Sequence, residues 1–366
     1  MIIKSLNALG VYGNASLNSV DLALVATDGV DVQRFIKTRT VHYPEELCLK
    51  IRALMTHRGW TYDTLNHNEQ VQAVREEISR FYIECIKEFA CKEQVDCYGI
   101  DGLTIFSNPD DKCSYQLEDG KVLANGLQQR IITHFHRADL LSGGQASPLT
   151  PAFFNCLCQN LEKPVLIIDV EAVSSLIVLG LSGELRAFDC APGTAMIEDW
   201  TFRHANMQTD YNGKLAVLGK PDRQILESML RHRVLKKVPP KALDILCFAD
   251  KKEHLEGLSL ENGAATATAF IAEAIFQAAF DFLPKIPQNI YVCGEGLKNP
   301  TLLRLIKQNF MPRAIHPITD ISSYLNAVGA QATAFNTVRR LYGLPLTYPA
   351  TTGAYEPLSG GEIYEA

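Results

Sequence analysis

Positive charge is not in excess in this chain of 366 residues, in which 35 Lys and Arg stand against 41 Asp and Glu for a formal net charge of -6. Nucleic-acid binding depends on a field of positive charge, so that class is excluded as a general expectation. No run approaches the roughly 20 apolar residues of a membrane span, and the charged N-terminus leads into an expected strand rather than a signal peptide. We therefore expect a cytoplasmic protein that binds neither nucleic acid nor membrane.

Paired cysteine motifs are also lacking. None of the ten cysteines has a Cys-x-x-Cys partner, and Cys156 and Cys158 are too close together for a zinc knuckle. The cysteines lie mostly in apolar segments, which is typical of reduced thiols that serve as small hydrophobic residues. The sequence therefore predicts no metal ligands among them.

The residues that are present describe a globular chain. A hydrophobic share of 47% with 21% charged residues is typical of that class, and the length favours two domains. Apolar runs predict strands at residues 6–12, 20–27 and 33–40, followed by a long helix that Asn68 can cap. The segment 166–194 repeats the three-strand pattern.

Three strands followed by alternating strands and helices, twice in one chain, is the plan of the duplicated ribonuclease-H-like kinases and ATPases. We therefore expect an α/β fold with two ribonuclease-H-like domains of the actin and hexokinase class and a cleft between them. The first domain is expected over residues 1–137 and the second over 138–366, with a C-terminal tail able to pack back on the first. A last long helix is expected over Ser323–Tyr342.

The turn between the first two strands is rich in small residues that let a backbone curl around a phosphate, and it has no Lys or Arg. Its residues of this kind are Gly10, Gly13, Asn14, Ser16, Asn18 and Ser19. Such a turn has the position of a phosphate loop in this fold but little of the chemistry.

Five ordered stretches make the likeness more specific. They read "GVYGNASLNSVDLALV", "RADLLSGGQASPLTPAF", "FDCAPGTAMIEDW", "VCGEGLKNPTL" and "AQATAFNTVRRLYGLPLTYPATTGA". In order and spacing the chain resembles the anhydro-N-acetylmuramic acid kinases over nearly its whole length. The resemblance implies a homodimer that uses Mg-ATP to open the 1,6-anhydro ring of its sugar and to phosphorylate O6, in peptidoglycan recycling.

Carried over residue by residue, the resemblance assigns the catalytic base to Asp189. From the residues alone this Asp is equally a helix N-cap, because a helix is expected directly after it. The positions assigned to the nucleotide are Gly13, Asn14, Ser16, Asn18, Glu171, Gly294 and Gly296.

The nucleotide loops depart from the family's pattern. Gly-Thr-Ser-Leu-Asp-Gly is replaced by the residues at 14–19, Asn-x-Gly-Gly by those at 169–172, and the middle of three glycines by Glu295. Carboxylates such as Glu171 would face the triphosphate, and like charges at short range repel. We therefore expect weak binding of Mg-ATP.

The sugar side departs as well. The positions assigned to the sugar are Asp101, Thr104, His134, His136 and Arg137. Asp101 and Leu103 replace the His and Gln of His-Gly-Gln-Thr, the two histidines replace the Asp and Arg of Asp-Phe-Arg, and Gly329 replaces a Glu inside the last helix. The two histidines are expected to alternate on one strand, so that both face the same side, with Asp101 able to lie near them.

The sequence thus predicts a sugar-binding family member with impaired or absent kinase activity. Two alternatives stay open. One is an active kinase on the family's substrate or on a different anhydro sugar, with Asp189 as base. The other is a metal-dependent hydrolase that uses Asp101, His134 and His136 as metal ligands. The simpler interpretation of these two histidines is that they lie in a widened polar cleft and bind no metal.

Overall fold

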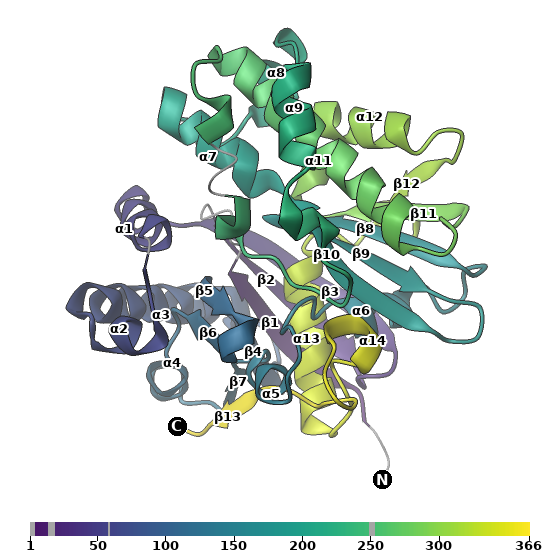
Figure 1. Cartoon of the computed structure of the whole chain (residues 1–366). Helices are drawn as coiled ribbons and strands as arrows, with labels where there is room; N and C mark the ends of the chain where they lie inside the picture. The colour runs from purple at the N-terminus through teal and green to yellow at the C-terminus, as the bar shows by residue number, and fades with distance from the viewer. Residues whose placement is uncertain (1–3, 14–18, 58, 249–252) are drawn as a thin grey trace. The chain divides into compact units, whose positions relative to one another are not determined.

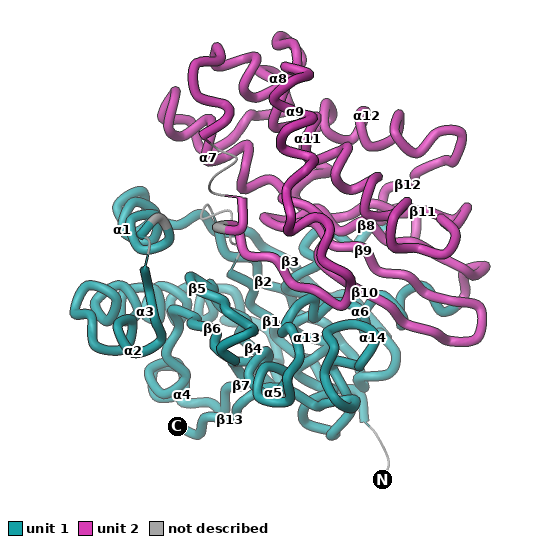
Figure 2. Tube along the Cα trace, in the orientation of Figure 1, with its two compact units in different colours: residues 1–159, 323–366 teal, residues 160–322 magenta. Residues whose placement is uncertain are grey.

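The computed structural model describes residues 4–13, 19–57, 59–248 and 253–366 (Figure 1). They form two compact units, one of residues 1–159 with 323–366 and one of residues 160–322 (Figure 2). The chain passes from unit 1 to unit 2 at residue 160 and returns to unit 1 at residue 323. The repeated strand pattern predicts a domain boundary between residues 137 and 138, and that boundary stays a prediction.

Unit 1 contains a six-stranded sheet in the order β13-β7-β4-β1-β2-β3. Its strands are β1 (Leu6–Gly13), β2 (Ser19–Thr27), β3 (Val32–His42), β4 (Cys97–Asp101), β7 (Ile131–Thr133) and β13 (Glu362–Tyr364). A separate hairpin joins β5 (Thr104–Asn108) to β6 (Cys113–Gln116). The helices are α1 (Glu45–Thr56), α2 (Tyr62–His67), α3 (Glu69–Ala90), α4 (Gly120–Leu127), α5 (Arg137–Leu141), α6 (Pro151–Leu157), α13 (Val328–Leu341) and α14 (Pro349–Thr352).

Local sequence explains where the helices of unit 1 begin. Asn68 caps α3 by accepting a hydrogen bond from the Val71 backbone N–H, as predicted. The expected start of the last helix at Ser323 was wrong, because α13 begins at Val328. Before it the chain turns, with the Asn326 N–H bonded to the Tyr324 carbonyl and the Asn326 side chain bonded to Thr38. Asn and Ser favour such turns over helix.

Glycines let α13 pack directly on the sheet of unit 1. A Cβ at Gly10 would lie 2.1 Å from the Ala330 carbonyl oxygen, and one at Gly99, its neighbour across the ladder, would lie 1.7 Å from the Thr337 hydroxyl. Gly10 therefore serves close packing inside β1, which corrects its assignment to the phosphate turn. Gly13 and Ser19 likewise end β1 and begin β2. Asn14, Ser16 and Asn18 lie outside the described residues.

Unit 2 contains a five-stranded sheet in the order β10-β9-β8-β11-β12. Its strands are β8 (Val165–Val170), β9 (Val173–Leu179), β10 (Leu185–Pro192), β11 (Asn289–Cys293) and β12 (Ile315–Pro317). Its helices are α7 (Thr194–Ala205), α8 (Lys214–Leu218), α9 (Arg223–Leu230), α11 (Leu260–Phe282) and α12 (Pro300–Asn309). Among the described helices, α11 has the length and apolar composition of a membrane span, but 78% of that window is buried within the structure. Its apolar character is that of a core helix, packed on α8, α12 and α7.

The two sheets share one topology. In each, three antiparallel strands are followed by two parallel ones, so that β3-β2-β1-β4-β7 in unit 1 corresponds to β10-β9-β8-β11-β12 in unit 2. This is the ribonuclease-H-like arrangement in both units, and the predicted α/β fold is confirmed. In unit 1 the C-terminal β13 adds a sixth strand, antiparallel to β7.

Candidate functional site

Asp189 lies in unit 2 on β10, the strand at one edge of the sheet, where it is almost fully buried. Its Oδ1 accepts a hydrogen bond of 2.6 Å from the Ser175 hydroxyl, and its Oδ2 accepts one of 2.9 Å from the Leu243 backbone N–H. The N-cap of the following helix α7 is Gly193, without a side-chain cap. The helix-cap reading of Asp189 was therefore wrong, and its carboxylate is oriented by groups from other segments.

A second carboxylate stands in the same row of the sheet. The ladders pair Ser175 with both Asp169 and Asp189, so these three residues lie side by side across β8, β9 and β10. Burial raises the pKa of Asp169 to about 6, and the charge of Asp189 adds to this rise, while a contact from the Cys293 thiol opposes it. The ladder with β9 shifts register directly after Asp189, an irregularity of the kind found beside active sites.

Three loops meet at the end of β8. The Thr194 N–H donates to the Glu171 carbonyl at 2.9 Å. Gly294 has a φ of +85°, and a Cβ there would lie 2.5 Å from the Val170 carbonyl oxygen. A Cβ at Gly296 would lie 2.5 Å from the Val170 side chain. The structure thus brings the predicted nucleotide residues Glu171, Gly294 and Gly296 to one place in unit 2.

Glu295, in the loop after β11, is partly exposed and forms an ion pair with the exposed Lys298, at 2.6 Å between Oε1 and Nζ. The two residues lie three positions apart in one short 3-10 helix, Glu295–Lys298. The Lys298 ammonium is therefore already engaged with a carboxylate. That Glu295 fills the space of a nucleotide stays a prediction.

In unit 1 the predicted sugar residues form two groups. The first contains Asp101, at the end of β4, whose Oδ1 lies 3.1 Å from His136 Nε2 and accepts a bond of 2.9 Å from Gln116 Nε2. Burial alone would lower the pKa of His136, but the Asp101 carboxylate and a bond to the Ala146 carbonyl raise it to about 9. His136 is therefore an imidazolium at neutral pH, at the position where the resemblance predicts Arg. Thr104 pairs with Gln116 in the hairpin beside this group.

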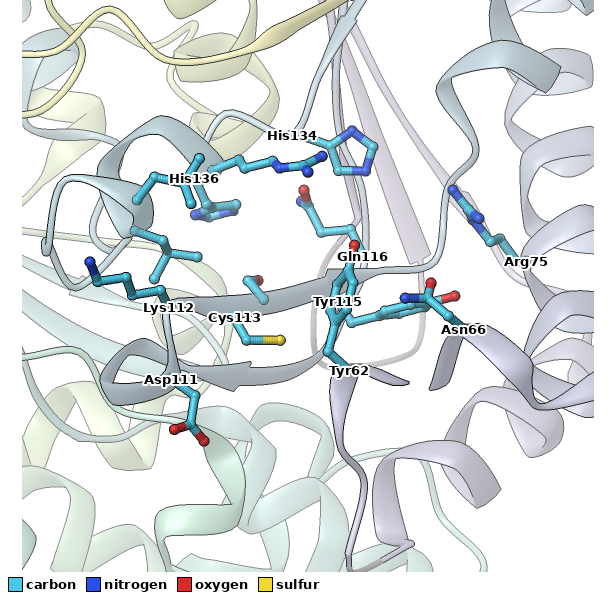
Figure 3. Close-up of a pocket in the computed structure, with 14 residues that line it drawn as sticks. Tyr62, Asn66, Arg75, Asp111, Lys112, Cys113, Tyr115, Gln116, His134 and His136 are labelled. Atoms are coloured by element: carbon cyan, nitrogen blue, oxygen red, sulfur yellow. The ribbon is translucent and has the colours of Figure 1, made fainter. Parts of the chain in front are cut away.

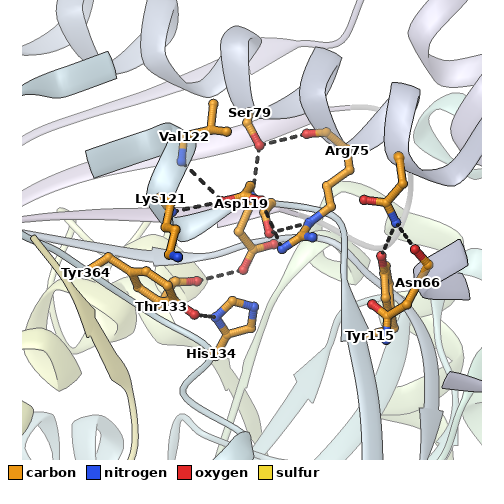
Figure 4. A network of polar contacts seen from close by, with 12 residues as sticks. Asn66, Arg75, Ser79, Tyr115, Asp119, Lys121, Val122, Thr133, His134 and Tyr364 are labelled. Atoms are coloured by element: carbon orange, nitrogen blue, oxygen red, sulfur yellow. Dashed lines mark hydrogen bonds and ion pairs between the residues drawn. The ribbon is translucent and has the colours of Figure 1, made fainter. Parts of the chain in front are cut away.

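The second group contains His134 and Arg137. The expected alternation of the two histidines on one strand was wrong, because β7 ends at Thr133 and His134 has a φ of +53°. Its Nδ1 lies 3.4 Å from the Tyr364 hydroxyl (Figure 4). Arg137 forms an ion pair of 2.9 Å with Glu362. Among the described residues no three His, Cys, Asp or Glu side chains are placed to hold a metal ion. The geometry therefore gives no support to the hydrolase alternative.

Glu118 is a buried carboxyl group beneath the first of these groups. Its Oε1 accepts bonds from the Thr133 hydroxyl at 2.7 Å and from the Gly102 N–H at 3.3 Å, whereas its Oε2 is buried without a partner among the described residues. Burial raises its pKa to about 7. A Cβ at Gly102 would lie 1.7 Å from Oε2, so the carboxyl group occupies space that only a glycine leaves free.

Both groups adjoin a pocket of about 290 Å³ within unit 1 (Figure 3). Its lining combines aromatic rings with polar and basic side chains, which is the mixture that a small polar ligand requires. The residues that line it include Tyr62, Asn66, Arg75, Lys112, Tyr115, Gln116, His134, His136 and Arg137.

Four of the residues around this pocket were missed by the sequence reasoning: Gln116, Glu118, Glu362 and Tyr364. Glu118 directly precedes Asp119, the N-cap of α4, and only its burial marks it as unusual. Glu362-Ile363-Tyr364 alternates polar and apolar residues, which is the signal of an edge strand and could have been read.

Gly329, where the resemblance predicts Glu, has a packing reason. It lies in the first turn of α13, not in the helix interior as predicted, and a Cβ there would lie 2.5 Å from the ring of Tyr12. The Tyr12 ring therefore occupies the space that a side chain at this position would need.

Comparison with known proteins shows which family the chain is similar to. The family model described as anhydro-N-acetylmuramic acid kinase matches residues 7–366. Proteins of that name from Paramagnetospirillum magneticum and Rhodospirillum rubrum are 34% and 33% identical over 97% and 98% of this chain, and the matches cover 98% and 94% of their own lengths. A solved structure, the activator of the 2-hydroxyisocaproyl-CoA dehydratase from Clostridium difficile with bound ADPNP, gives a TM-score of 0.45 at 12% identity, covering 92% of this chain and 97% of that one. On the family match and the full-length relatives, the chain belongs to the anhydro-N-acetylmuramic acid kinase family.

Proposed function

We propose that this protein binds the 1,6-anhydro amino sugar of its family in the unit 1 pocket and phosphorylates it slowly or not at all. The observation that carries the proposal is the contrast between two parts of unit 2. The Asp189 carboxylate is held by Ser175 and Leu243, as a general base must be. The turn at the end of β8 carries Glu171 where the resemblance predicts glycine.

The pocket has the chemistry for a sugar. Both N–H groups of the His136 imidazolium are bonded within the protein, to Asp101 and to the Ala146 carbonyl, so His136 contributes positive charge, as do Arg75 and Arg137. The ring of Tyr115 offers an apolar face. Positive groups suit the carboxylate of a muramic acid, although each of these cations is also paired within the protein, His136 with Asp101, Arg137 with Glu362 and Arg75 with Asp119. A clamp of this kind positions the ring, and positioning supplies much of the rate in phosphoryl transfer.

Asp189 would take a proton from the water that opens the anhydro ring at C1. Its two hydrogen bonds fix the direction of the carboxylate, so that the oxygen need not reorient during the reaction. A second carboxyl group, that of Asp169, lies in the same row of the sheet as Asp189 and Ser175. Burial raises the pKa of Asp169, so the charged form of this carboxyl group is disfavoured there.

Magnesium and the nucleotide differ in how well they fit this turn. Asp169 and Glu171 offer carboxylate oxygens, which are the ligands that Mg²⁺ takes, and a bound ion would supply neutralisation of phosphate charge. The triphosphate fits poorly, because Glu171 repels it and Lys298, a cation of the adjacent loop, is paired with Glu295. We therefore propose weak binding of Mg-ATP. A homodimer and a role in peptidoglycan recycling are proposed from the resemblance alone, since burial accounts for the apolar surface of α11.

Calorimetric titration of the full chain with 1,6-anhydro-N-acetylmuramic acid and, separately, with Mg-ATP tests the proposal. We expect the sugar to bind and Mg-ATP to bind weakly. The double variant Glu171→Gly, Glu295→Gly should bind Mg-ATP at least tenfold more tightly, whereas the matched variant Glu171→Asp, which keeps the charge, should not. Low-micromolar binding of Mg-ATP by the unaltered chain, with phosphorylated sugar that disappears in Asp189→Asn, would overturn the reduced activity.

A further inference from the structure

The C-terminal strand brings two side chains, Glu362 and Tyr364, against Arg137 and His134, which line the unit 1 pocket. β13 pairs antiparallel with β7. Glu362 lies opposite Thr133, the last residue of β7, and Tyr364 lies opposite Ile131. Their side chains, two positions apart on one strand, share a face, and the Tyr364 hydroxyl donates to Glu362 Oε2 at 2.8 Å. Figure 4 shows the Tyr364 hydroxyl close to the His134 ring.

The tail is anchored at several points, so this placement is not that of a loose end. Arg340 Nε donates to the Gly361 carbonyl at 2.8 Å, and Arg130 pairs with Glu365 at 2.7 Å. The ring of Tyr364 lies against Gly120, where a Cβ would come within 2.5 Å of it. The strand therefore holds Glu362 and Tyr364 in fixed positions relative to β7.

The number of protons decides which nitrogen of His134 carries hydrogen. A tyrosine has one hydroxyl proton, and a carboxylate can only accept. Because the Tyr364 proton lies on the bond to Glu362, the Tyr364 oxygen must accept from His134 Nδ1, 3.4 Å away. Burial lowers the pKa of His134 to about 4, against the opposing charge of Glu362 and with the help of Arg75, Arg137 and His136. The ring is therefore neutral at pH 7, with its proton on Nδ1.

The other ring nitrogen, Nε2, then has a free lone pair. His134 lines the pocket (Figure 3), and among the described residues Nε2 has no hydrogen-bond partner. We propose that the C-terminal strand, through Glu362 and Tyr364, holds His134 in the Nδ1–H tautomer so that its Nε2 accepts a hydrogen bond from a hydroxyl or N–H of the sugar. This inference rests on the proposed function for the identity of the ligand, but not for the tautomer.

His134 thus replaces one kind of acceptor by another. The resemblance predicts Asp at this position, an acceptor whatever its surroundings. A neutral imidazole accepts at only one nitrogen, and which one depends on the partner of the other. Glu362 and Tyr364 are accordingly positioning residues, and their effect on the sugar should pass through His134.

Nitrogen-15 spectra of the histidine-labelled full chain at pH 7 test the tautomer without any ligand, with the His134 signals assigned by their loss in His134→Gln. We expect the unaltered chain to show a protonated Nδ1 and an unprotonated Nε2. Tyr364→Phe keeps the ring on Gly120 but removes the hydroxyl, and should give a mixture of tautomers. Glu365→Gln, in the same tail, should leave the spectrum unchanged. A protonated Nε2 in the unaltered chain would refute the inference.

Calorimetry with 1,6-anhydro-N-acetylmuramic acid tests the consequence. Tyr364→Phe should weaken binding about fivefold, the scale of one neutral hydrogen bond. In a His134→Asp background the same substitution should have no effect, because Asp accepts without the relay, whereas a general loosening of the tail would weaken both. Equal weakening in both backgrounds contradicts the inference. No sugar binding by the unaltered chain would refute the contact with Nε2 and the proposed function together, while the tautomer is judged by the spectra alone.

Discussion

His136 Nε2 lies 3.1 Å from Asp101 Oδ1, and the two side chains form a largely buried ion pair at the wall of the unit 1 pocket. Because the pKa of His136 is raised from 6.5 to about 9, the folded chain holds this proton more tightly than the unfolded chain. The resulting stabilisation is complete below about pH 6.5 and is lost as the pH rises to 9. The His136–Asp101 ion pair therefore makes the free energy of unfolding of unit 1 depend on pH.

The free energy of unfolding of the unaltered chain and of His136→Gln should accordingly differ most at pH 6 and least above pH 9. The change in that difference should be on the order of 3 kcal/mol, from the shift in pKa. Urea denaturation at several pH values measures it, and taking the difference between the two chains cancels the groups that titrate in both. A difference that stays constant from pH 6 to 9 would show that Asp101 does not raise the pKa of His136.

The free energy of unfolding of Glu118→Gln, relative to that of the unaltered chain, should increase as the pH rises. The pKa of Glu118 is raised from 4.5 to about 7 by burial, so the folded state favours the protonated acid and loses that advantage between pH 4.5 and 7. Gln keeps the oxygen that Thr133 and Gly102 bond and carries no charge. Relative to the unaltered chain, the variant should gain on the order of 3 kcal/mol between pH 5 and 8, measured by urea denaturation. Thr133→Val, which removes a donor but no titrating group, serves as the comparison.

Gly329→Ala should destabilise unit 1 by about 1–3 kcal/mol, the usual cost of overpacking. The added Cβ would lie 2.5 Å from the Tyr12 ring. In a Tyr12→Ala background the same change should be neutral or stabilising by up to about 1 kcal/mol, because Ala favours helix over Gly. A double-mutant cycle on thermal unfolding measures the coupling. Equal effects in both backgrounds would exclude the Tyr12 contact as the reason for the glycine.

Gly10→Ala should cost more than Gly329→Ala, because the added Cβ meets the backbone of α13 and not the edge of a side chain. It would lie 2.1 Å from the Ala330 carbonyl oxygen and 2.4 Å from the Ala334 nitrogen. Gly126→Ala, whose Cβ would meet only the end of the Ile83 side chain, is the matched control. Hydrogen exchange of α13 amides should rise in Gly10→Ala and stay unchanged in the control.

The sequence predicted the fold well because both sheets repeat one pattern of apolar runs. The strands at the start of each unit and the cap at Asn68 are set by local signals, alternation and a side-chain acceptor, that a single sequence displays. Gly10 was misread because its reason is a helix more than 300 residues later in the chain, and no local pattern reports such an approach.

The candidate site was less predictable for the same reason. The residues that motifs single out, Asp189 and Asp101, do lie among oriented polar groups. Their partners do not stand in motifs: Leu243 contributes only its backbone N–H, and Tyr364 reaches His134 from the last strand. Whether a His is charged depends on the neighbours that the fold supplies, which is why His134 and His136, two positions apart, have pKa values shifted in opposite directions.

The helices α13 and α14 and the strand β13 belong to unit 1 but follow unit 2 in the chain, so they are synthesised after it. The sheet on which they pack is encoded before residue 134, whereas residues 160–322 form the other unit. At about 5–20 residues per second, that intervening stretch alone takes on the order of ten to thirty seconds to synthesise. During this time the glycine-lined face of β1 and β4 and the free edge of β7 have no covering from the chain's own C-terminal segment. Unit 2, which is encoded without interruption, can therefore complete its fold before unit 1 does.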